Sequence, residues 1–349
     1  STDHECFTEA EALNKLNYKY QIEWQDFNFN QRFYTNPIDP QWLNHFNSTT
    51  HLNVLNNAFY ATINQLKNPT SILQVFNLPA YKTHKDTNIK HAIKDWTAYA
   101  YLLQGNFRAA KQDPNMPTYL YYGIAAVVDF LTGNDDKALA EFDEYLKQYR
   151  KEKRSRKTVP SNFAALCYVL VLLKKQTPES IAAATDFLSR TTNQAAKLLD
   201  TVILLHKNQP LEAQNLIKDK IDQLNGIDEK IIAYYCLHWL DNGALNAYQT
   251  PIEQLYQQAI NNNYQWIAFE LANLLRIINP QNNNYNQNYQ QLSQQIAAKS
   301  IASCYQRKES WMMALQALSM LNPNESANKN SRLVWHLSFN PYIIVPFEQ

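Results

Sequence analysis

Glycine is scarce in this chain of 349 residues, which holds five glycines where an average composition would give about 24. No two of the five stand closer than ten residues in the sequence. Phosphate-binding loops need several glycines in one tight turn, because the backbone must approach the phosphates without a Cβ atom. The glycine-rich loops of dinucleotide-binding folds and of P-loop enzymes are therefore excluded, and turn-rich β-sandwiches and propellers are disfavoured.

The chain also lacks paired cysteines, a charge imbalance and long apolar runs. Its four cysteines include no C-x-x-C pair, which argues against a zinc ribbon or a disulfide framework. The 32 basic and 31 acidic residues give a net charge of +1, so no overall field attracts nucleic acid or a membrane. The longest apolar run, 163–173, is shorter than the roughly 20 residues of a spanning helix, and the first residues show no signal-peptide order. We therefore expect a cytoplasmic chain with reduced thiols and no membrane contact.

Patterns of catalytic or metal-binding residues are missing as well. The eight histidines form no i, i+4 pair and have no cysteine at ligand spacing, and no G-x-S-x-G motif occurs. Cys236 and His238 lie two residues apart on a predicted helix and project from different faces, so we predict a packed histidine. The acids Asp135 and Asp136 stand where a helix N-terminus favours negative charge. The sequence thus predicts no catalytic residue, no metal site and no cofactor.

From about Asn88 to Leu321, apolar residues recur at helical spacing and are interrupted by short polar turns. A hairpin cannot bury its apolar face alone, so neighbouring hairpins should stack into a solenoid. The spacings between the turns are 28, 43, 33 and 33 residues, which resembles the roughly 34-residue tetratricopeptide repeat. We predict an all-α, tetratricopeptide-like solenoid, with a generic helical array as the alternative. The predicted turns lie near Gly105, Gly133, Gln176, Gln209 and Asn242.

The two ends differ from this middle region. Residues 18–34 alternate apolar and polar side chains, which suits one or two strands as well as an irregular packed segment. The asparagine- and glutamine-rich run 279–290 is predicted to be a solvated loop without function. We divide the chain into an N-terminal mixed or helical subdomain (1–90), the repeat region (91–322) and a β-hairpin-like start of a following domain (331–349).

One segment carries a strong local charge. Residues 147–157 hold seven basic residues and one acidic residue, a net charge of +6. Such a run can neutralise several phosphates of DNA or dock on an acidic surface, and Tyr145 and Tyr149 could add stacking to a single strand. The alternative is a solvated helix end, because cations are favoured at a helix C-terminus. The predicted contact residues are Lys147, Arg150, Lys151, Lys153, Arg154, Arg156 and Lys157.

A second region is rich in aromatic residues at helical spacing. We predict that these side chains belong to the core or line the concave groove of the solenoid, where a peptide would be the alternative ligand. The predicted groove residues are Tyr234, Tyr235, Trp239, Tyr264 and Trp266.

Four phrases, read in order, resemble a known family. They are RKEKRSRKTVPSNFAALCYVLVLLKK, YYCLHWLDNGAL, AINNNYQWIAFELANLL, and SWMMALQALSML followed by SRLVWHLSFNPYIIVPFEQ. Together they are similar to the long helical region ahead of the motor in large bacterial Swi/Snf-type helicase-like ATPases. The resemblance runs from about residue 96 to the end. It implies a parent enzyme that hydrolyses ATP and moves along double-stranded DNA or remodels proteins on it.

The motor's phosphate loop, acidic magnesium-binding motif and arginine finger have no counterparts in this sequence. We therefore expect a non-catalytic helical-repeat region that regulates or targets such a translocase. Its groove would bind a protein partner or the parent's own motor domain, and its basic run would touch DNA or an acidic surface. The alternative is a free-standing tetratricopeptide-like adaptor or bacterial effector that binds a protein partner.

Overall fold

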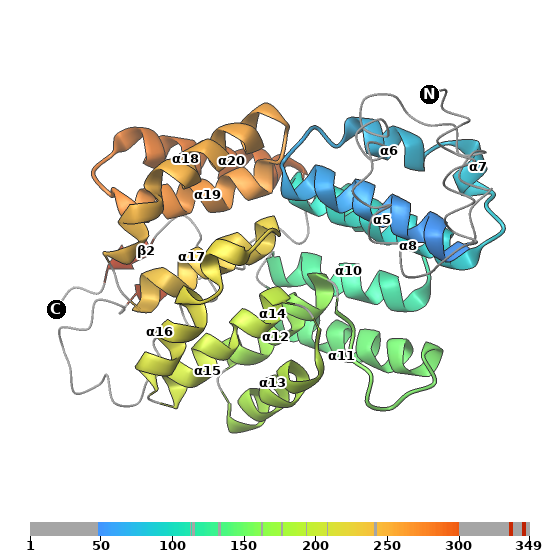
Figure 1. Ribbon diagram of the computed structural model, residues 1–349, viewed down its shortest axis with the longest axis horizontal. Helices are drawn as coiled ribbons and strands as arrows, with labels where there is room; N and C mark the ends of the chain where they lie inside the picture. Colours follow the sequence, from blue (N-terminus) through green and yellow to red (C-terminus); the bar gives the residue numbers. More distant parts are fainter. Residues whose placement is uncertain are drawn as a thin grey trace. The chain divides into compact units, whose positions relative to one another are not determined.

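The computed structural model describes residues 48–299, with gaps at 112, 114–115, 132–133, 162, 176, 193, 208 and 241–242, together with residues 335–337 and 344–346. The chain divides into two compact units, Ser1–Ala100 and Tyr101–Gln349. Helices and strands keep the labels of Figure 1. Residues 18–34, for which strands were one prediction, lie outside the described residues, and the predicted boundaries at 90 and 322 stay predictions.

The described part of the first unit is helical and has an aromatic core. Trp96 stacks on both Phe59 and Phe76, with ring centroids 5.7 Å apart in each pair. Rings at this separation attract one another beyond the effect of burial alone. The three rings join three helices of the unit. The helices are α5 (Ser48–Asn64), α6 (Thr70–Phe76), α7 (Pro79–Lys82) and α8 (Thr87–Leu103), which runs past the unit boundary.

The second unit is a succession of short helices, and neighbours in the sequence remain neighbours in space (Figure 1). This order confirms the predicted all-α fold of helical hairpins. The α-helices are α9 (Phe107–Lys111), α10 (Thr118–Leu131), α11 (Asp135–Glu152), α12 (Phe163–Lys175), α13 (Pro178–Arg190), α14 (Gln194–Leu198), α15 (Asp200–His206), α16 (Pro210–Lys218), α17 (Ile227–Leu240), α18 (Gln249–Asn261), α19 (Gln265–Ile278) and α20 (Asn283–Lys299). Two 3₁₀ turns, η2 (Ile221–Gln223) and η3 (Ala244–Tyr248), flank α17.

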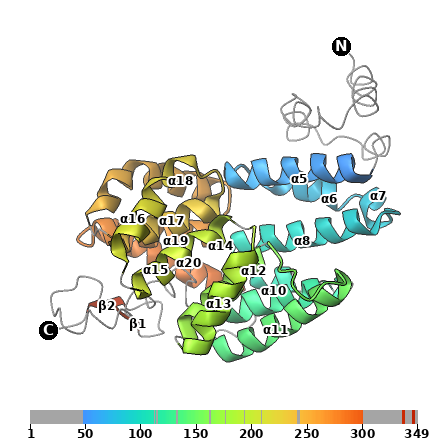
Figure 2. The same cartoon turned by 60° about the horizontal axis from the view of Figure 1, so that its bottom comes forward.

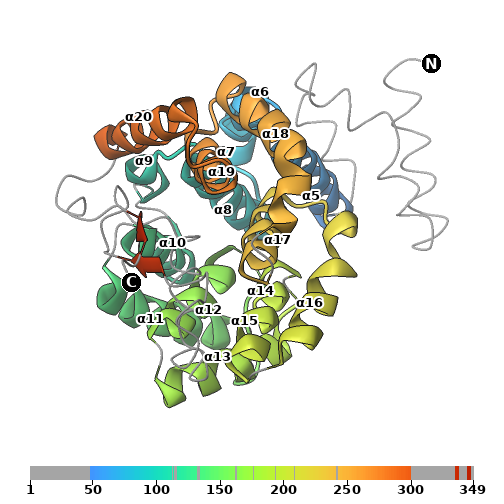
Figure 3. The same ribbon diagram turned by 90° about the vertical axis from the view of Figure 1, so that its left-hand side faces the viewer.

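Helix pairs are the building blocks of this unit. Helix α10 packs against α11, α12 against α13 and α15 against α16, while α19 contacts both α18 and α20 (Figures 2 and 3). Successive pairs also touch one another, because α12 contacts α10 and α11, and α17 contacts α16 and α19. Each pair therefore covers part of its neighbour's apolar face, as a repeat array requires.

A close helix approach at a glycine lies between α10 and α11. A Cβ atom at Gly123 would stand 3.2 Å from two ring carbons of Tyr145 and 3.4 Å from the Cβ atom of Ala164. Helices approach closely where one of them carries no side chain. Gly123 thus brings the ring of Tyr145 against the backbone of α10.

The asparagine- and glutamine-rich run was wrongly predicted to be a loop, because α20 begins at Asn283 and includes most of it. Tyr289 is completely buried and stacks on Phe269 with ring centroids 4.7 Å apart. Tyr285, Tyr289 and Leu292 follow the i, i+4, i+7 spacing of one helix face. The apolar stripe outweighs the polar composition between its members.

At the C-terminal end, β1 (Trp335–Leu337) and β2 (Ile344–Pro346) pair antiparallel, with Trp335 opposite Pro346. The predicted C-terminal β element therefore has two short strands. None of the helices in the described part of the chain combines the length and apolar character needed to cross a bilayer.

Candidate functional site

The basic run forms the last turns of α11 and the turn after it, and we call residues 147–157 the basic hook. Helix α11 has Asp135 and Asp136 in its first turn and Arg150 and Lys151 in its last. Negative charge at a helix start and positive charge at its end both complement the helix dipole. The local sequence thus favours a helix that stops inside the basic run.

Backbone hydrogen bonds give the hook a defined turn. The N–H of Ser155 donates to the carbonyl of Arg150 at 3.1 Å, and the N–H of Arg154 donates to the carbonyl of Lys151 at 3.2 Å. This pair of bonds is the Schellman arrangement that ends many helices. Arg154 occupies its left-handed position, with φ 49°. The hook is therefore an ordered turn that carries cationic side chains.

Two of the cations lie beside acids of the same helix. Lys147, whose side chain is 72% exposed, lies 3.1 Å from Glu144, and Lys153, which is 48% exposed, lies 3.9 Å from Glu152. Ion pairs on an exposed surface contribute little to stability, because solvent screens the charges and the side chains lose freedom. Neither ion pair therefore holds the hook in its conformation.

The other exposed cations of the hook are unpaired. Their side chains reach solvent and have no ion-pair partner among the residues that the structure describes. Positive charges this close together repel one another unless a ligand supplies negative charge. These residues are Lys151, Arg154, Arg156 and Lys157.

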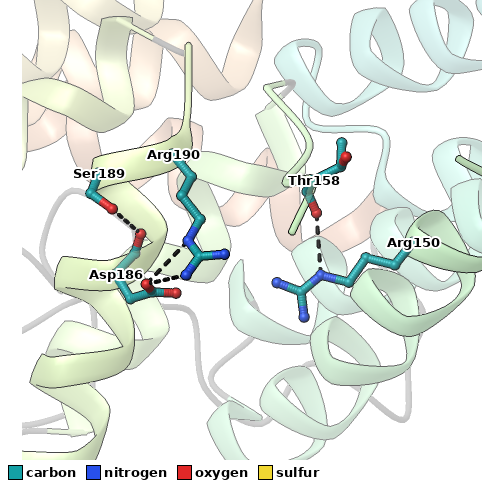
Figure 4. Close-up of polar contacts among 5 residues, drawn as sticks. All are labelled: Arg150, Thr158, Asp186, Ser189 and Arg190. Carbon is teal, nitrogen blue, oxygen red and sulfur yellow. Dashed lines mark hydrogen bonds and ion pairs between the residues drawn. The ribbon is translucent and has the colours of Figure 1, made fainter. Parts of the chain in front are cut away.

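Arg150 stabilises the turn of the hook. It is half-buried, and its Nε donates a hydrogen bond to the carbonyl of Thr158 at 3.2 Å (Figure 4). The contact ties the chain that leaves the hook back to α11. On α13, Arg190 appears in the same view and is paired with Asp186, with Nη2 to Oδ1 at 2.6 Å. Of the seven predicted contact residues, Arg150 is therefore the one with a structural task.

The stacking predicted for the neighbouring tyrosines is wrong for Tyr145, which is 2% exposed in the core between α10 and α12. Tyr149 is half-buried, with its ring 6.1 Å from the ring of Tyr119 and 6.2 Å from that of Tyr145. The Nζ atom of Lys153 lies 5.7 Å from the ring centre of Tyr149. The rings near the hook thus already have partners within the chain.

Four of the five predicted groove residues are buried in the core. Tyr235 and Tyr264 are fully buried, Trp266 is 2% exposed and Tyr234 is 6% exposed, so these side chains do not line an accessible groove. The side chain of Trp239 lies outside the described part of the structure. Burial favours the core interpretation, because aromatic residues at helical spacing supply the largest apolar areas for packing between helices.

Inside this core lies a polar network that the sequence did not reveal. The Tyr235 hydroxyl donates to Glu270 Oε2 at 3.2 Å and accepts a hydrogen bond from Asn273 Nδ2 at 2.7 Å. Asn273 Oδ1 accepts from Arg276 Nη2 at 2.8 Å, and the guanidinium of Arg276 lies 4.0 Å from the ring centre of Tyr289. Burial raises the pKa of Tyr235 well above 10, which keeps its hydroxyl a donor. The network joins α17, α19 and α20 and is a structural feature.

A second buried charge cluster lies between α9, α10 and α11. Asp129 is fully buried, and its Oδ2 lies 3.1 Å from Lys137 Nζ and 3.7 Å from Lys111 Nζ. Burial, a hydrogen bond to Asp129 and the charge of Asp129 raise the pKa of Glu141 to about 8, against the two lysines. The Glu141 carboxyl group therefore keeps its proton at neutral pH. Asp129 was visible as the only charged residue of an apolar helix, but its partners were not.

Two histidines of the described residues, His51 and His238, are buried. His238 is 2% exposed, which confirms the prediction, and burial lowers its pKa to about 4. In the first unit, His51 and His84 meet edge to face with ring centroids 5.3 Å apart, and His51 Nε2 lies 3.3 Å from the Tyr81 hydroxyl. The spacing rules missed this pair, because His51 lies on α5 and His84 in the loop between α7 and α8. Across the described residues, no three His, Cys, Asp or Glu side chains are placed to share a metal ion.

Comparisons with known proteins found no matching family model, no matching curated protein and no matching solved structure.

Proposed function

We propose that this chain is a non-catalytic helical-repeat interaction region that contacts an anionic macromolecule through the basic hook. The observation that carries the proposal is the set of four exposed, unpaired cations within residues 151–157. They stand on a turn whose backbone is hydrogen-bonded, so the turn that carries these four residues is already formed before a ligand binds. A preorganised cationic surface loses little conformational entropy when it meets a polyanion.

The order of the phrases that resemble Swi/Snf-type proteins supports a role next to a DNA-translocating motor. In that setting the hook would target or regulate the motor on DNA, while other faces of the helical array would hold a protein partner or the motor itself. The coding sequence that follows codon 349 tests this setting. A P-loop and a D-E-x-H-type motif there would support it, and a stop codon would favour the free-standing adaptor.

The direct test is binding of labelled polyanions, measured by fluorescence anisotropy over a range of salt concentrations. The probes are a DNA duplex of about 20 base pairs, the single strand of equal length, and polyglutamate. In the test variant, glutamine replaces the five exposed cations of residues 151–157. Arg150 is kept, because its hydrogen bond to Thr158 holds the turn. The replaced residues are Lys151, Lys153, Arg154, Arg156 and Lys157. We expect this variant to lose most of the salt-dependent binding.

A matched control removes five exposed lysines elsewhere, so that both variants have the same net charge. We expect the control to keep most of the affinity of the wild type, because its lysines lie outside the hook and are spread along the chain from residue 82 to residue 218. Equal losses in the two variants, or no binding of any probe at about 50 mM salt, would overturn the proposal. An ATPase activity that copurifies with the chain through stringent steps would overturn its non-catalytic part. The control lysines are Lys82, Lys85, Lys175, Lys207 and Lys218.

A further inference from the structure

The left-handed position of the turn that ends α11 is occupied by Arg154, a residue with a Cβ atom. Four helix ends in the described chain have the same pair of closing hydrogen bonds and place a residue with positive φ at the same position. The left-handed conformation is unfavourable for residues with a Cβ atom, and glycine is the usual occupant. The four residues are Leu66, Gly105, Arg154 and Asn263, with φ of 50°, 72°, 49° and 65°.

Three of these four positions have a local reason for their residue. Gly105 carries no Cβ atom, and asparagine, as at Asn263, tolerates the left-handed region better than most residues. Leu66 is completely buried, so its packing offsets the strain. Arg154 is exposed and has no ion pair within the described chain. An unfavourable residue at a strained backbone position, with no packing of its side chain to offset the strain, points to a function.

The surroundings of Arg154 indicate what kind of ligand it meets. Single-stranded nucleic acid is held by aromatic rings on which bases stack, together with cations along the backbone. Near the hook, Tyr145 is buried and Tyr149 is packed by Tyr119 and Lys153. Tyr121 on α10 is 40% exposed, but it lies two residues from Tyr119 and so projects from the other side of that helix. The hook therefore offers cations without a stacking platform.

The acids around the hook do not cancel this charge. Glu144 is engaged by Lys147 and Gln148, and Asp143 accepts a hydrogen bond from the Tyr168 hydroxyl at 3.1 Å. Glu152 lies 3.9 Å from Lys153. Lys151, Arg154, Arg156 and Lys157 have no acid beside them among the described residues and are left to an external ligand.

We infer that the hook binds the phosphate backbone of duplex nucleic acid, with Arg154 at its tip as a direct phosphate ligand and Arg150 as the residue that positions the turn. The inference rests on the proposed function and assigns a ligand class to that surface. A guanidinium can donate two parallel hydrogen bonds to one phosphate. Because phosphate contacts do not read bases, the affinity is independent of sequence.

Three substitutions at one position separate charge from strain. Arg154→Gln removes the charge and keeps the strained backbone, Arg154→Lys keeps a charge, and Arg154→Gly removes both the charge and the strain. Lys218→Gln, on the exposed end of α16, is the matched loss of one charge. Each variant is titrated with the duplex and with the single strand of equal length, over a range of salt concentrations.

We expect Arg154→Gln and Arg154→Gly to bind the duplex about tenfold more weakly than wild type, the effect of one charge-assisted hydrogen bond. The slope of log affinity against log salt should fall by about 0.9 in each. Arg154→Lys should lose less, and Lys218→Gln almost nothing. Arg154→Gly should also have a higher urea midpoint, which excludes unfolding as the cause of its weaker binding. Duplexes of different sequence should bind alike.

The failures of this inference and of the proposed function are distinguishable. If Arg154→Gln behaves like Lys218→Gln while the five-residue hook variant still loses binding, the role of Arg154 is overturned and the proposed function stands. If the single strand binds as tightly as the duplex, or if polyglutamate displaces the duplex at equal charge, the ligand class is overturned. If the five-residue variant itself binds like wild type, both proposals fail.

Discussion

The two ends of the α10–α11 hairpin differ in whether their charges have partners within the chain. Near the start of α11, Lys137 and Glu141 surround the buried Asp129 of α10, so that each charge has compensation within the chain. At the end of the same helix, Lys151 and Arg154 project into solvent without acidic partners among the described residues. Buried charge is tolerated only when it is paired. The comparison teaches that charge serving the fold is matched internally, while unmatched charge is available to a partner.

The largest expected effect is the loss of Asp129. Asp129→Ala leaves Lys111, whose side chain is 14% exposed, without its carboxylate, and breaking a buried pair by removing one partner is strongly destabilising. We expect a loss of about 3 kcal/mol in the free energy of unfolding, measured by urea denaturation followed by circular dichroism. Asp186→Ala, at an exposed pair on α13, should change stability by less than about 0.5 kcal/mol. Similar losses in the two variants would show that Asp129 is not a structural charge.

A smaller loss of stability is expected when the polar network inside the aromatic core is disrupted. Tyr235→Phe removes a hydroxyl that bonds both Glu270 and Asn273 and leaves two buried polar groups with one partner fewer. We expect a loss of about 2 kcal/mol in the same urea experiment. Tyr234→Phe is the control on the adjacent residue, whose hydroxyl has no hydrogen bond among the described contacts. If both variants are equally stable, the network does not support the fold.

The stability that the buried charge cluster contributes depends on pH through Glu141. Its pKa in the folded chain is about 8, above the usual 4.5, so the folded state keeps a proton that the unfolded chain releases. This contribution to stability is complete below pH 4.5 and is lost as the pH rises to about 8. Glu141→Gln mimics the protonated group and should be more stable than wild type by about 1 kcal/mol at pH 8, after allowance for solvent screening.

Urea midpoints measured from pH 4.5 to pH 8.5 check this sign, with Glu212→Gln on exposed α16 as the control. The wild type and the control should lose stability over the interval, and Glu141→Gln should lose less. A wild-type stability that rises over the interval would contradict the raised pKa of Glu141.

Sequence reasoning was successful where one helix carries the whole signal. Apolar spacing and polar turns identified the hairpins, and the clustering of seven cations identified the hook. The loop predicted at residues 279–290 was wrong, because composition was weighted above the spacing of Tyr285 and Tyr289. A periodic apolar stripe is the stronger signal, since it decides which face is buried.

The sites that were missed depend on contacts between helices. Asp129 and Glu141 stand on different helices, and His51 of α5 meets His84 of the loop after α7. Both contacts are decided by packing that local patterns do not encode. For the same reason, Tyr235 and Trp266 could not be assigned to core or groove beforehand. The sequence alone also could not show which cations of the hook lack partners. Arg150 is an example, because its contact with Thr158 depends on how the chain turns after α11.

The strain at Arg154 predicts a modest gain in stability. Arg154→Gly relieves the left-handed backbone of a residue with a Cβ atom, and we expect a gain of about 1 kcal/mol by urea denaturation. Arg156→Gly is the control, because the φ of Arg156 is not positive and glycine there only adds freedom to the unfolded chain. A loss of stability in Arg154→Gly would remove the argument that the hook retains an unfavourable residue for its charge.

The smallest effect tests whether the hook's charge is available to a partner. Glu144→Gln removes the acid that lies beside Lys147 and keeps an amide in its place. Stability should not change measurably, because the ion pair is exposed, but Lys147 becomes available to phosphate and duplex affinity should rise about twofold. Glu179→Gln on α13 supplies the same change in net charge away from the hook and should leave the affinity nearly unaltered. Anisotropy titrations at low salt make the distinction, since equal gains in both variants would mean that overall charge, and not the hook, determines binding.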